Sequence, residues 1–375
     1  MRIAYVCTDP GIEVFGTKGA SVHAREMIAA FLATGAGVTL ISPRIGRIPD
    51  CHAALRPWPL PALPAAADAK DRARALIAQN DAVVHALREA GPFDLVYERH
   101  ALFAHSAMEE AVRQAIPGVQ EVNAPLIGES LRHRKLPLPD LARASTGRAM
   151  RAAAWVSAVS PAVADYARSH GAARIEVIAN AVNPDRFPSV IRPAGRQTVG
   201  FLGTLRPWHD VETLLKAMKL LRVTVPQARL LIVGDGPERA RLGAALTELG
   251  AEMPGAVAPD EVPGWLARMD IAVAPYASGQ PFYFSPLKIY EYMASGLPVV
   301  ASNVGDLARL VRHDQTGLIC PPDDPAAMAR ALHRLAHAPD EARRMGAAGR
   351  RIVLARHRWS DVAQRILRLS CRKAA

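Results

Sequence analysis

Residues 285–302, SPLKIYEYMASGLPVVAS, contain the pattern that sets the fold class. Ser285 is a good helix N-cap and Pro286 suits the first helical position, so a short helix is predicted to begin here. Gly296 is expected to end that helix, and the apolar run of residues 299–301 that follows is typical of a buried strand. A helix that feeds directly into a buried strand is the unit from which parallel α/β sheets are built.

Lys288 lies in the first turn of this predicted helix, where the free N–H groups and the helix dipole favour anions and disfavour cations. Glu291 follows one turn later on the same face. One interpretation is an i,i+3 ion pair on a solvated face, which contributes a few tenths of a kcal/mol. The other is an external anion that the helix N-terminus and Lys288 bind together. For an isolated helix, the ion pair is the more common arrangement.

The same alternation of short apolar runs and helical stretches extends along the chain. It predicts strands at residues 3–7, 37–42, 93–99, 119–123, 155–160, 174–180, 198–203, 229–236, 271–276 and 298–302. Helical patterns occupy residues 21–35, 68–91, 104–115, 161–171, 210–221 and 237–250, and a helical tail follows the last strand. Such alternation predicts a fold of class α/β with parallel, doubly wound sheets.

The Pro-rich segment 183–195 reads as a linker between two such sheets. We therefore expect two Rossmann-like lobes facing each other across a cleft, with residues 1–185 and 196–355 as domains. A length of 375 residues suits two domains of ordinary size.

Composition indicates a globular protein of the reducing cell interior. The four cysteines (Cys7, Cys51, Cys320 and Cys371) lie far apart and show no metal or redox spacing. No run of residues resembles a spanning helix, and the N-terminus lacks the pattern of a signal peptide. A cytoplasmic location is the expectation.

The net charge of +11 is unevenly distributed. Residues 330–375 carry 12 Lys and Arg against 3 Asp and Glu, and residues 132–151 carry six basic residues against Asp140 alone. Solvated helix faces would explain both clusters. An anionic membrane surface is the alternative, and a nucleic-acid partner is less favoured because interleaved aromatic residues are missing.

Loops that follow predicted strands are the places where ligands bind in such sheets. In the first of them, Gly16 and Gly19 flank Lys18 before a helix that Ser21 is expected to cap. Glycines at a helix start can form a cradle for phosphate or sugar hydroxyl groups, although an ordinary βα turn has the same composition. His23, in the first turn of that helix, is more often a structural residue than a catalytic one.

Two further loops contain residues that could bind phosphate. Arg206 offers a planar donor fork suited to phosphate oxygens, and His209 follows it, with an ordinary imidazole that would be partly charged at pH 7. Gly234 begins a G-x-G turn, but no third glycine follows, so a dinucleotide fingerprint is not predicted. The sequence contains no P-loop, no HExxH and no Cys/His cluster, and no metal or cofactor is expected.

Together these stretches resemble family 4 glycosyltransferases of the two-lobed GT-B fold, over nearly the whole chain. The matching motifs occur in order: GTKGASVH, FDLVYERHALF, EVNAPL, SAVSPAVADY, VIANAVNPDRF, FLGTLRPWHD, LLIVGDGPERARL, GWLARMDIAVAPY and SPLKIYEYMASGLPVVAS. The resemblance implies a retaining enzyme that uses a nucleotide-diphosphate sugar without a metal ion. It places the acceptor in the first lobe and the donor in the second, and a basic helix at 356–375 against the first lobe.

The resemblance also implies site residues. The helix start at Ser285, Pro286, Leu287 and Lys288 would face the donor diphosphate, with Arg206 on a phosphate and Glu291 on the nucleotide ribose. Donor binding would also involve Gly16, Lys18, Gly19, His209 and Gly234. Arg206, Lys288 and Glu291, with His23 as a further candidate, would be catalytic, while His23 and Asn123 would line the acceptor side of the cleft.

The chain departs from the family pattern at four positions. Tyr283 stands where a first glutamate is common, His209 where a lysine is common, Asn123 where many members have a histidine, and Ala181 where a glycine is usual. These departures indicate a subgroup with SPLK and EVNAPL variants.

The resemblance makes a sugar or lipid-linked acceptor the expected second substrate, in cell-surface polysaccharide or glycolipid synthesis. The two basic clusters would then form one face that holds the enzyme at the inner membrane leaflet, and no specific nucleic acid is expected. A nucleotide-sugar epimerase, a non-catalytic nucleotide-sugar-binding protein and a nucleic-acid-binding protein are the alternatives.

Overall fold

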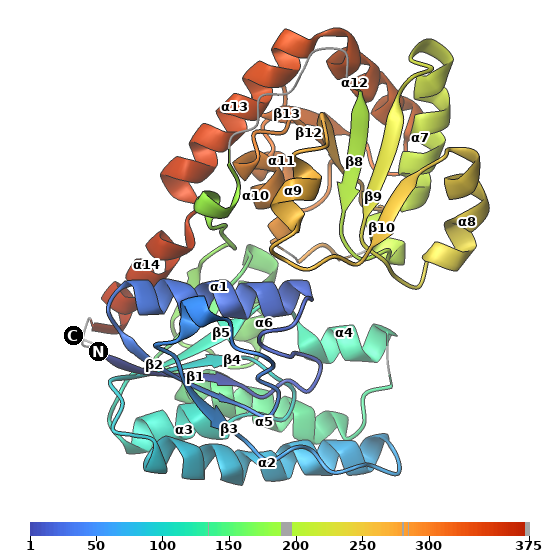
Figure 1. The fold of residues 1–375 in the computed structure, drawn as a ribbon. Coiled ribbons are helices and arrows are strands. Elements are labelled where there is room, and N and C mark those ends of the chain that lie inside the picture. Colours follow the sequence, from blue (N-terminus) through green and yellow to red (C-terminus); the bar gives the residue numbers. More distant parts are fainter. Residues whose placement is uncertain (134, 189–196, 280, 284, 372–375) are drawn as a thin grey trace. The chain divides into compact units, whose positions relative to one another are not determined.

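The computed structural model describes residues 1–375 except 134, 189–196, 280, 284 and 372–375. The chain forms two compact units (Figure 1). Unit 1 contains Met1–Asn180, Tyr283–Ser285 and Trp359–Ala375, and unit 2 contains Ala181–Phe282 and Pro286–Arg358. The first boundary therefore follows Asn180, earlier than the expected 185, and most of the predicted linker lies outside the described residues.

Unit 1 contains a seven-stranded parallel sheet. Its order is β3-β2-β1-β4-β5-β6-β7. The strands are β1 (Arg2–Cys7), β2 (Gly37–Ser42), β3 (Arg56–Pro59), β4 (Leu95–Arg99), β5 (Gly118–Val122), β6 (Trp155–Ala158) and β7 (Ile175–Val177). The helices are α1 (Gly19–Ala33), α2 (Ala69–Glu89), α3 (Ser106–Arg113), α4 (Leu126–His133), α5 (Pro139–Ala152), α6 (Pro161–Ser169) and α14 (Trp359–Cys371).

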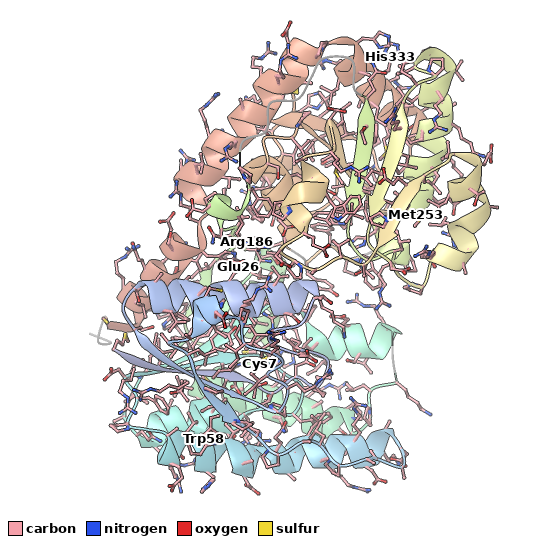
Figure 2. The ribbon with its side chains drawn as sticks, viewed as in Figure 1. Cys7, Glu26, Trp58, Arg186, Met253 and His333 are labelled. Carbon is pink, nitrogen blue, oxygen red and sulfur yellow. The ribbon has the colours of Figure 1, made fainter. Side chains whose placement is uncertain are left out.

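Helices cover both faces of this sheet (Figure 1). α2, α3 and α5 pack on one face around a core that includes Val83 and Met108. Trp58 of the edge strand β3 packs against the same core (Figure 2). On the other face α14 lies against α1, and it buries Trp359, Ala363 and Ile366. The last helix of the chain therefore completes the first unit.

Unit 2 contains a six-stranded parallel sheet. Its order is β10-β9-β8-β11-β12-β13. The strands are β8 (Thr198–Leu202), β9 (Arg229–Val233), β10 (Glu252–Gly255), β11 (Ile271–Ala274), β12 (Val299–Ser302) and β13 (Gly317–Cys320). The helices are α7 (Val211–Thr224), α8 (Arg239–Glu248), α9 (Val262–Leu266), α10 (Leu287–Ala294), α11 (Leu307–Leu310), α12 (Pro325–His337) and α13 (Pro339–Arg356). α7, α8 and α12 share one core, and α9, α10 and part of α13 share the other.

The two parallel, doubly wound sheets confirm the predicted fold class. The interior strands were all predicted, whereas three edge strands (β3, β10 and β13) were not. β3 contains Pro57 and Pro59, and β10 contains Pro254. Proline cannot donate to a ladder and is confined to edges, so these strands lack the apolar signal of a central strand.

α10 is shorter than predicted, because it begins at Leu287 after Pro286 and has no side-chain cap. Ser285 is not the N-cap: its Oγ instead accepts a hydrogen bond from the Asn180 N–H (3.0 Å). The predicted end is confirmed. Gly296 has φ +68°, and its N–H donates to the Met293 carbonyl while Leu297 N–H donates to the Tyr292 carbonyl, which is a Schellman motif.

No helix in the described part of the chain is long and apolar enough to cross a membrane.

Candidate functional site

Two glycines bring the loops after β8 and β9 together in unit 2. Gly203 N–H donates to the Val233 carbonyl (2.9 Å). A Cβ on Gly234, whose φ is +138°, would lie 2.1 Å from the Gly203 carbonyl oxygen. Only a glycine allows this approach, so Gly234 shapes the loop through its missing side chain.

Lys288 of α10 lies against this loop. The residue is 8% exposed, and its Nζ has no hydrogen-bond partner among the described residues. Nζ lies 4.3 Å from the centroid of the Phe201 ring and 5.4 Å from that of Tyr276. Burial lowers the pKa of Lys288 to about 7, and the partly buried Glu291 opposes that shift. The interpretation of Lys288 as part of an ion pair on a solvated helix face is therefore wrong, because its ammonium group is buried over aromatic rings.

His209 lies beside the same rings but carries no charge. Its Nδ1 donates to the Thr204 carbonyl (2.6 Å), and its ring makes edge contacts with Phe201 and Tyr276. Burial, together with the neighbouring Lys288, lowers the pKa of His209 to about 3. The expected partial charge is thus absent, because the imidazole lies in an apolar, electropositive environment. Its Nε2 is left as a hydrogen-bond acceptor.

Arg206 precedes the short helical turn Pro207–His209, and the His209 N–H donates to the Arg206 carbonyl (3.0 Å). Its guanidinium is exposed, 5.6 Å from the ring centroid of Trp208, and makes no ion pair within the described ranges. The start of α10 adds free N–H groups and the positive end of a helix dipole. Unit 2 thus brings Gly203, Arg206, His209 and Lys288 into one electropositive site, and no carboxylate among the described residues pairs with its cations.

The glycine-rich loop of unit 1 is arranged differently from the expectation. α1 begins at Gly19, with Lys18 preceding it, so Ser21 lies inside the helix and does not cap it. Gly16 closes a turn by donating to the Glu13 carbonyl (2.9 Å). The Nζ of Lys18 donates to the Gly11 carbonyl (3.1 Å), within the loop itself.

His23 is held in a buried hydrogen-bond network. Its Nε2 lies 2.5 Å from Glu121 Oε1, which also accepts from the Tyr97 hydroxyl (2.7 Å). Arg99 Nη1 donates to Glu121 Oε2 (3.2 Å). Burial raises the pKa of Glu121, but His23, Arg99 and Tyr97 outweigh it and lower that pKa to about 2. Glu121 is consequently an ionised carboxylate.

A cavity of about 10 Å³, room for about one water molecule, adjoins this network. His23, Glu121, Asn123, Asn180 and Trp359 all line it. Asn123 Nδ2 and Asn180 Oδ1 are both buried and have no partner among the described residues. The structure therefore brings His23 and Asn123 to the same cavity, and their role as acceptor-site residues stays a prediction.

Sequence reasoning missed several residues of these sites, among them Gly203, Glu121 and Trp359. Gly203 was seen only as the end of a strand, and Glu121 only as part of the motif EVNAPL. Trp359 contacts His23 edge-on (ring centroids 4.8 Å apart), although the two are separated by most of the chain. The motif EVNAPL was a usable signal for Glu121, whereas no local pattern identified the other two.

The basic residues of the C-terminal region are divided between the two units, and those of α14 belong to unit 1. Those between Arg330 and Arg358 belong to unit 2, while residues 132–151 belong to unit 1. Several are also neutralised: Arg334 pairs with Glu341 (2.6 Å), and Arg148 pairs with Glu109 (2.7 Å). The expected positive face therefore stays a prediction.

In the part of the chain that the structure describes, no group of three or more His, Cys, Asp or Glu side chains could hold a metal ion.

Comparison with known proteins covers both units. Residues 17–186 match the profile of glycosyltransferase family 4, and residues 196–338 match that of glycosyl transferases group 1. A GDP-mannose-dependent alpha-mannosyltransferase of Mycobacterium tuberculosis is 31% identical over 301 residues, 76% of this chain and 74% of the relative. D-inositol 3-phosphate glycosyltransferase of Streptomyces scabiei is 30% identical over 307 residues, 73% of this chain and 68% of the relative.

Solved structures share the fold at lower identity. Sucrose-phosphate synthase from Thermosynechococcus elongatus superposes with a TM-score of 0.74 at 21% identity, covering 98% of both chains. Anabaena HepE in complex with UDP and glucose gives a TM-score of 0.73 at 20% identity, covering 98% of this chain and 99% of that one. With both units matched and relatives at 30% identity along most of their length, the chain belongs to the family 4 glycosyltransferases.

Proposed function

We propose that this glycosyltransferase moves a sugar from a nucleoside-diphosphate donor to an acceptor hydroxyl group, with retention of configuration and without a metal ion. The buried Lys288 ammonium carries the proposal. A cation taken out of water without a hydrogen-bond partner is costly, and a diphosphate would supply the missing acceptor. Relatives that use GDP-mannose and a neighbour of the same fold that binds UDP support this class of donor.

The leaving diphosphate gains negative charge as the bond to the sugar breaks. Lys288, the N-terminus of α10 and the exposed guanidinium of Arg206 are placed in one site where they can stabilise that charge. Glu291, one turn along α10, would accept hydrogen bonds from the nucleotide ribose. His209 can accept a hydrogen bond through Nε2 but adds no charge while its pKa stays at about 3.

Retention follows if the acceptor attacks the face from which the diphosphate leaves. The acceptor oxygen then bonds to the anomeric carbon, the bond from that carbon to the phosphate oxygen breaks, and the acceptor proton passes to the leaving phosphate. No protein base is required on this route. Stabilisation of the leaving group is the contribution of the protein.

The test is thermal stabilisation by UDP, GDP and ADP, each with EDTA present. We expect one of them to raise the melting temperature, since a ligand that binds only the folded state stabilises it. The variant Glu291→Ala should lose most of that shift. Glu248→Ala, which removes an exposed carboxylate of α8 that pairs with Lys219, should keep it. No shift with any nucleotide, or a shift that needs a divalent metal, would contradict the proposal.

We further propose a lipid-linked acceptor and a location at the anionic inner face of the membrane, in glycolipid or polysaccharide synthesis. In unit 1, Leu131 (53% exposed) and Leu141 (49% exposed) lie on α4 and α5 near the exposed Arg132 and Lys135. Exposed apolar and basic side chains together favour an anionic lipid surface. A relative that is a phosphatidylinositol monomannoside mannosyltransferase supports a glycolipid acceptor.

Cosedimentation with vesicles tests this location. The protein should bind vesicles containing anionic lipid better than neutral ones, and the double variant Leu131→Ser/Leu141→Ser should reduce that binding. Val223→Ser removes an even more exposed apolar side chain (79% exposed) from α7 of unit 2 and should have no effect. Equal binding to anionic and neutral vesicles would count against the proposal.

A further inference from the structure

The buried pair of His23 and Glu121 is built from three elements of unit 1. Tyr97 and Arg99 lie two residues apart on β4, and Arg99 is directly paired with Glu121 on β5 in the parallel register. Residues two apart on a strand point to the same face, so both side chains reach the Glu121 carboxylate. α1 brings His23 to the same carboxylate. All four side chains are buried.

This arrangement determines the tautomer of His23. The ionised Glu121 carboxylate can only accept hydrogen bonds, and its Oε1 lies 2.5 Å from His23 Nε2. Nε2 must therefore carry a proton. In the neutral imidazole the other nitrogen, Nδ1, then has a lone pair that can accept a hydrogen bond.

The histidine ring is also fixed on its other side. Trp359 of α14 packs against it edge-to-face, with ring centroids 4.8 Å apart and ring planes at 73°. Both residues line the small cavity that Asn123 enters at the carboxyl end of β5. Ligands in parallel sheets bind beyond the carboxyl ends of the strands, so His23 is in the right place to meet one.

We propose that Glu121 is a positioning residue that holds His23 as the Nε2–H tautomer, so that Nδ1 accepts a hydrogen bond from a substrate hydroxyl group. The identity of the substrate as a sugar rests on the proposed function; the tautomer does not. A carboxylate that holds a histidine in this way acts through orientation, because it does not itself touch the substrate.

Nitrogen NMR of the full-length protein, labelled with ¹⁵N-histidine near pH 8, tests the tautomer. The His23→Gln spectrum identifies the signals of His23 among the 12 histidines. We expect a protonated Nε2 and an unprotonated Nδ1 in the wild type. Glu121→Gln should reverse this, because its amide oxygen would keep accepting from Arg99 at the position of Oε2. Its NH₂ group would then take the position of Oε1 and donate to the histidine ring and to the Tyr97 hydroxyl oxygen. Glu121→Asp should restore the original tautomer.

Glu98→Gln is the matched control. Glu98 is a buried carboxyl on the neighbouring strand β4, and burial raises its pKa to about 8, so a neutral form that the amide can replace persists at the pH of the measurement. Its variant should leave the His23 signals unchanged. A wild-type His23 that is protonated on Nδ1 or on both nitrogens would overturn the proposal, and this result requires only the assignment variant His23→Gln to fold.

Donor hydrolysis measures the consequence for chemistry. With UDP-glucose or GDP-mannose as the probe, Glu121→Gln should slow nucleotide release about tenfold, the fold-change that one ordinary hydrogen bond is worth. Water takes the place of the acceptor in this assay. The hydrolysis rate should therefore fall whether His23 Nδ1 accepts its hydrogen bond from the donor sugar or from the attacking hydroxyl group. The thermal shift by UDP or GDP should be unchanged, which separates this proposal from a failure of nucleotide binding. A normal hydrolysis rate in a variant with the reversed tautomer would overturn the role of His23.

Discussion

The ammonium group of Lys288 fills the space where a side chain at residue 203 would stand. A Cβ on Gly203 would lie 2.8 Å from Nζ, and Gly203 has φ +143°, a conformation that other residues rarely adopt. The glycine therefore serves two purposes: it permits the turn after β8, and it leaves the cation its position over the Phe201 ring. Four predictions follow from this contact and from the surrounding fold.

Gly203→Ala should displace the Lys288 ammonium and strain the turn. We expect a loss of about 1–3 kcal/mol in the free energy of unfolding, the usual cost of an unfavourable backbone conformation. Stabilisation by the preferred nucleotide should largely disappear. Denaturant unfolding and thermal shift measure the two effects. Gly264→Ala, at a glycine of α9 where a Cβ meets nothing within 4 Å, should change neither by much.

Lys288→Met should abolish nucleotide stabilisation but make the free protein more stable. A buried charge without a hydrogen-bond partner is unfavourable, and replacing buried ions with apolar groups of similar volume is often neutral or stabilising by about 1–4 kcal/mol. Chemical denaturation and thermal shift distinguish the two effects. Lys216→Met removes an exposed lysine that pairs with Glu212, and it should cost less than about 1 kcal/mol. A large destabilisation by Lys288→Met would contradict the interpretation that the buried charge of Lys288 is unfavourable in the free protein.

Nucleotide binding should take up a proton. Burial lowers the pKa of Lys288 from 10.5 to about 7, so between these values the unfolded chain holds a proton that the folded chain lacks. This group therefore makes stability rise with pH over that window. A bound diphosphate should raise the pKa again. Calorimetry near pH 8 in two buffers of different ionisation enthalpy should show different binding heats, and identical heats would contradict the prediction.

Deleting residues 359–375 should destabilise unit 1 although the deleted segment follows unit 2 in the sequence. α14 buries Trp359, Ala363 and Ile366 against unit 1. Losing two large apolar side chains should cost about 4 kcal/mol or more. Thermal unfolding measures the loss, and deletion of residues 372–375 alone is the control. Equal melting temperatures for both deletions would show that α14 contributes little.

Local patterns in the sequence were sufficient for the two parallel sheets and for the family. Central strands are buried on both faces, so runs such as residues 230–233 are continuously apolar and can be recognised without tertiary context. β3 and β10 carry prolines at the sheet edge and gave no such signal. The end of α10 was also predicted, because Gly296 supplies the left-handed conformation that a helix terminus needs.

The sequence by itself determined the order of elements, the parallel sheets and the residue types available for binding an anion. Tertiary structure alone decided that Lys288 is buried without a hydrogen-bond partner among the described residues, that Glu121 contacts His23 and that Trp359 packs against the His23 ring. Backbone periodicity depends on neighbours within a few residues, which the sequence displays directly. Burial, pKa and hydrogen-bond partners depend on segments that are distant in the chain and meet only when it folds.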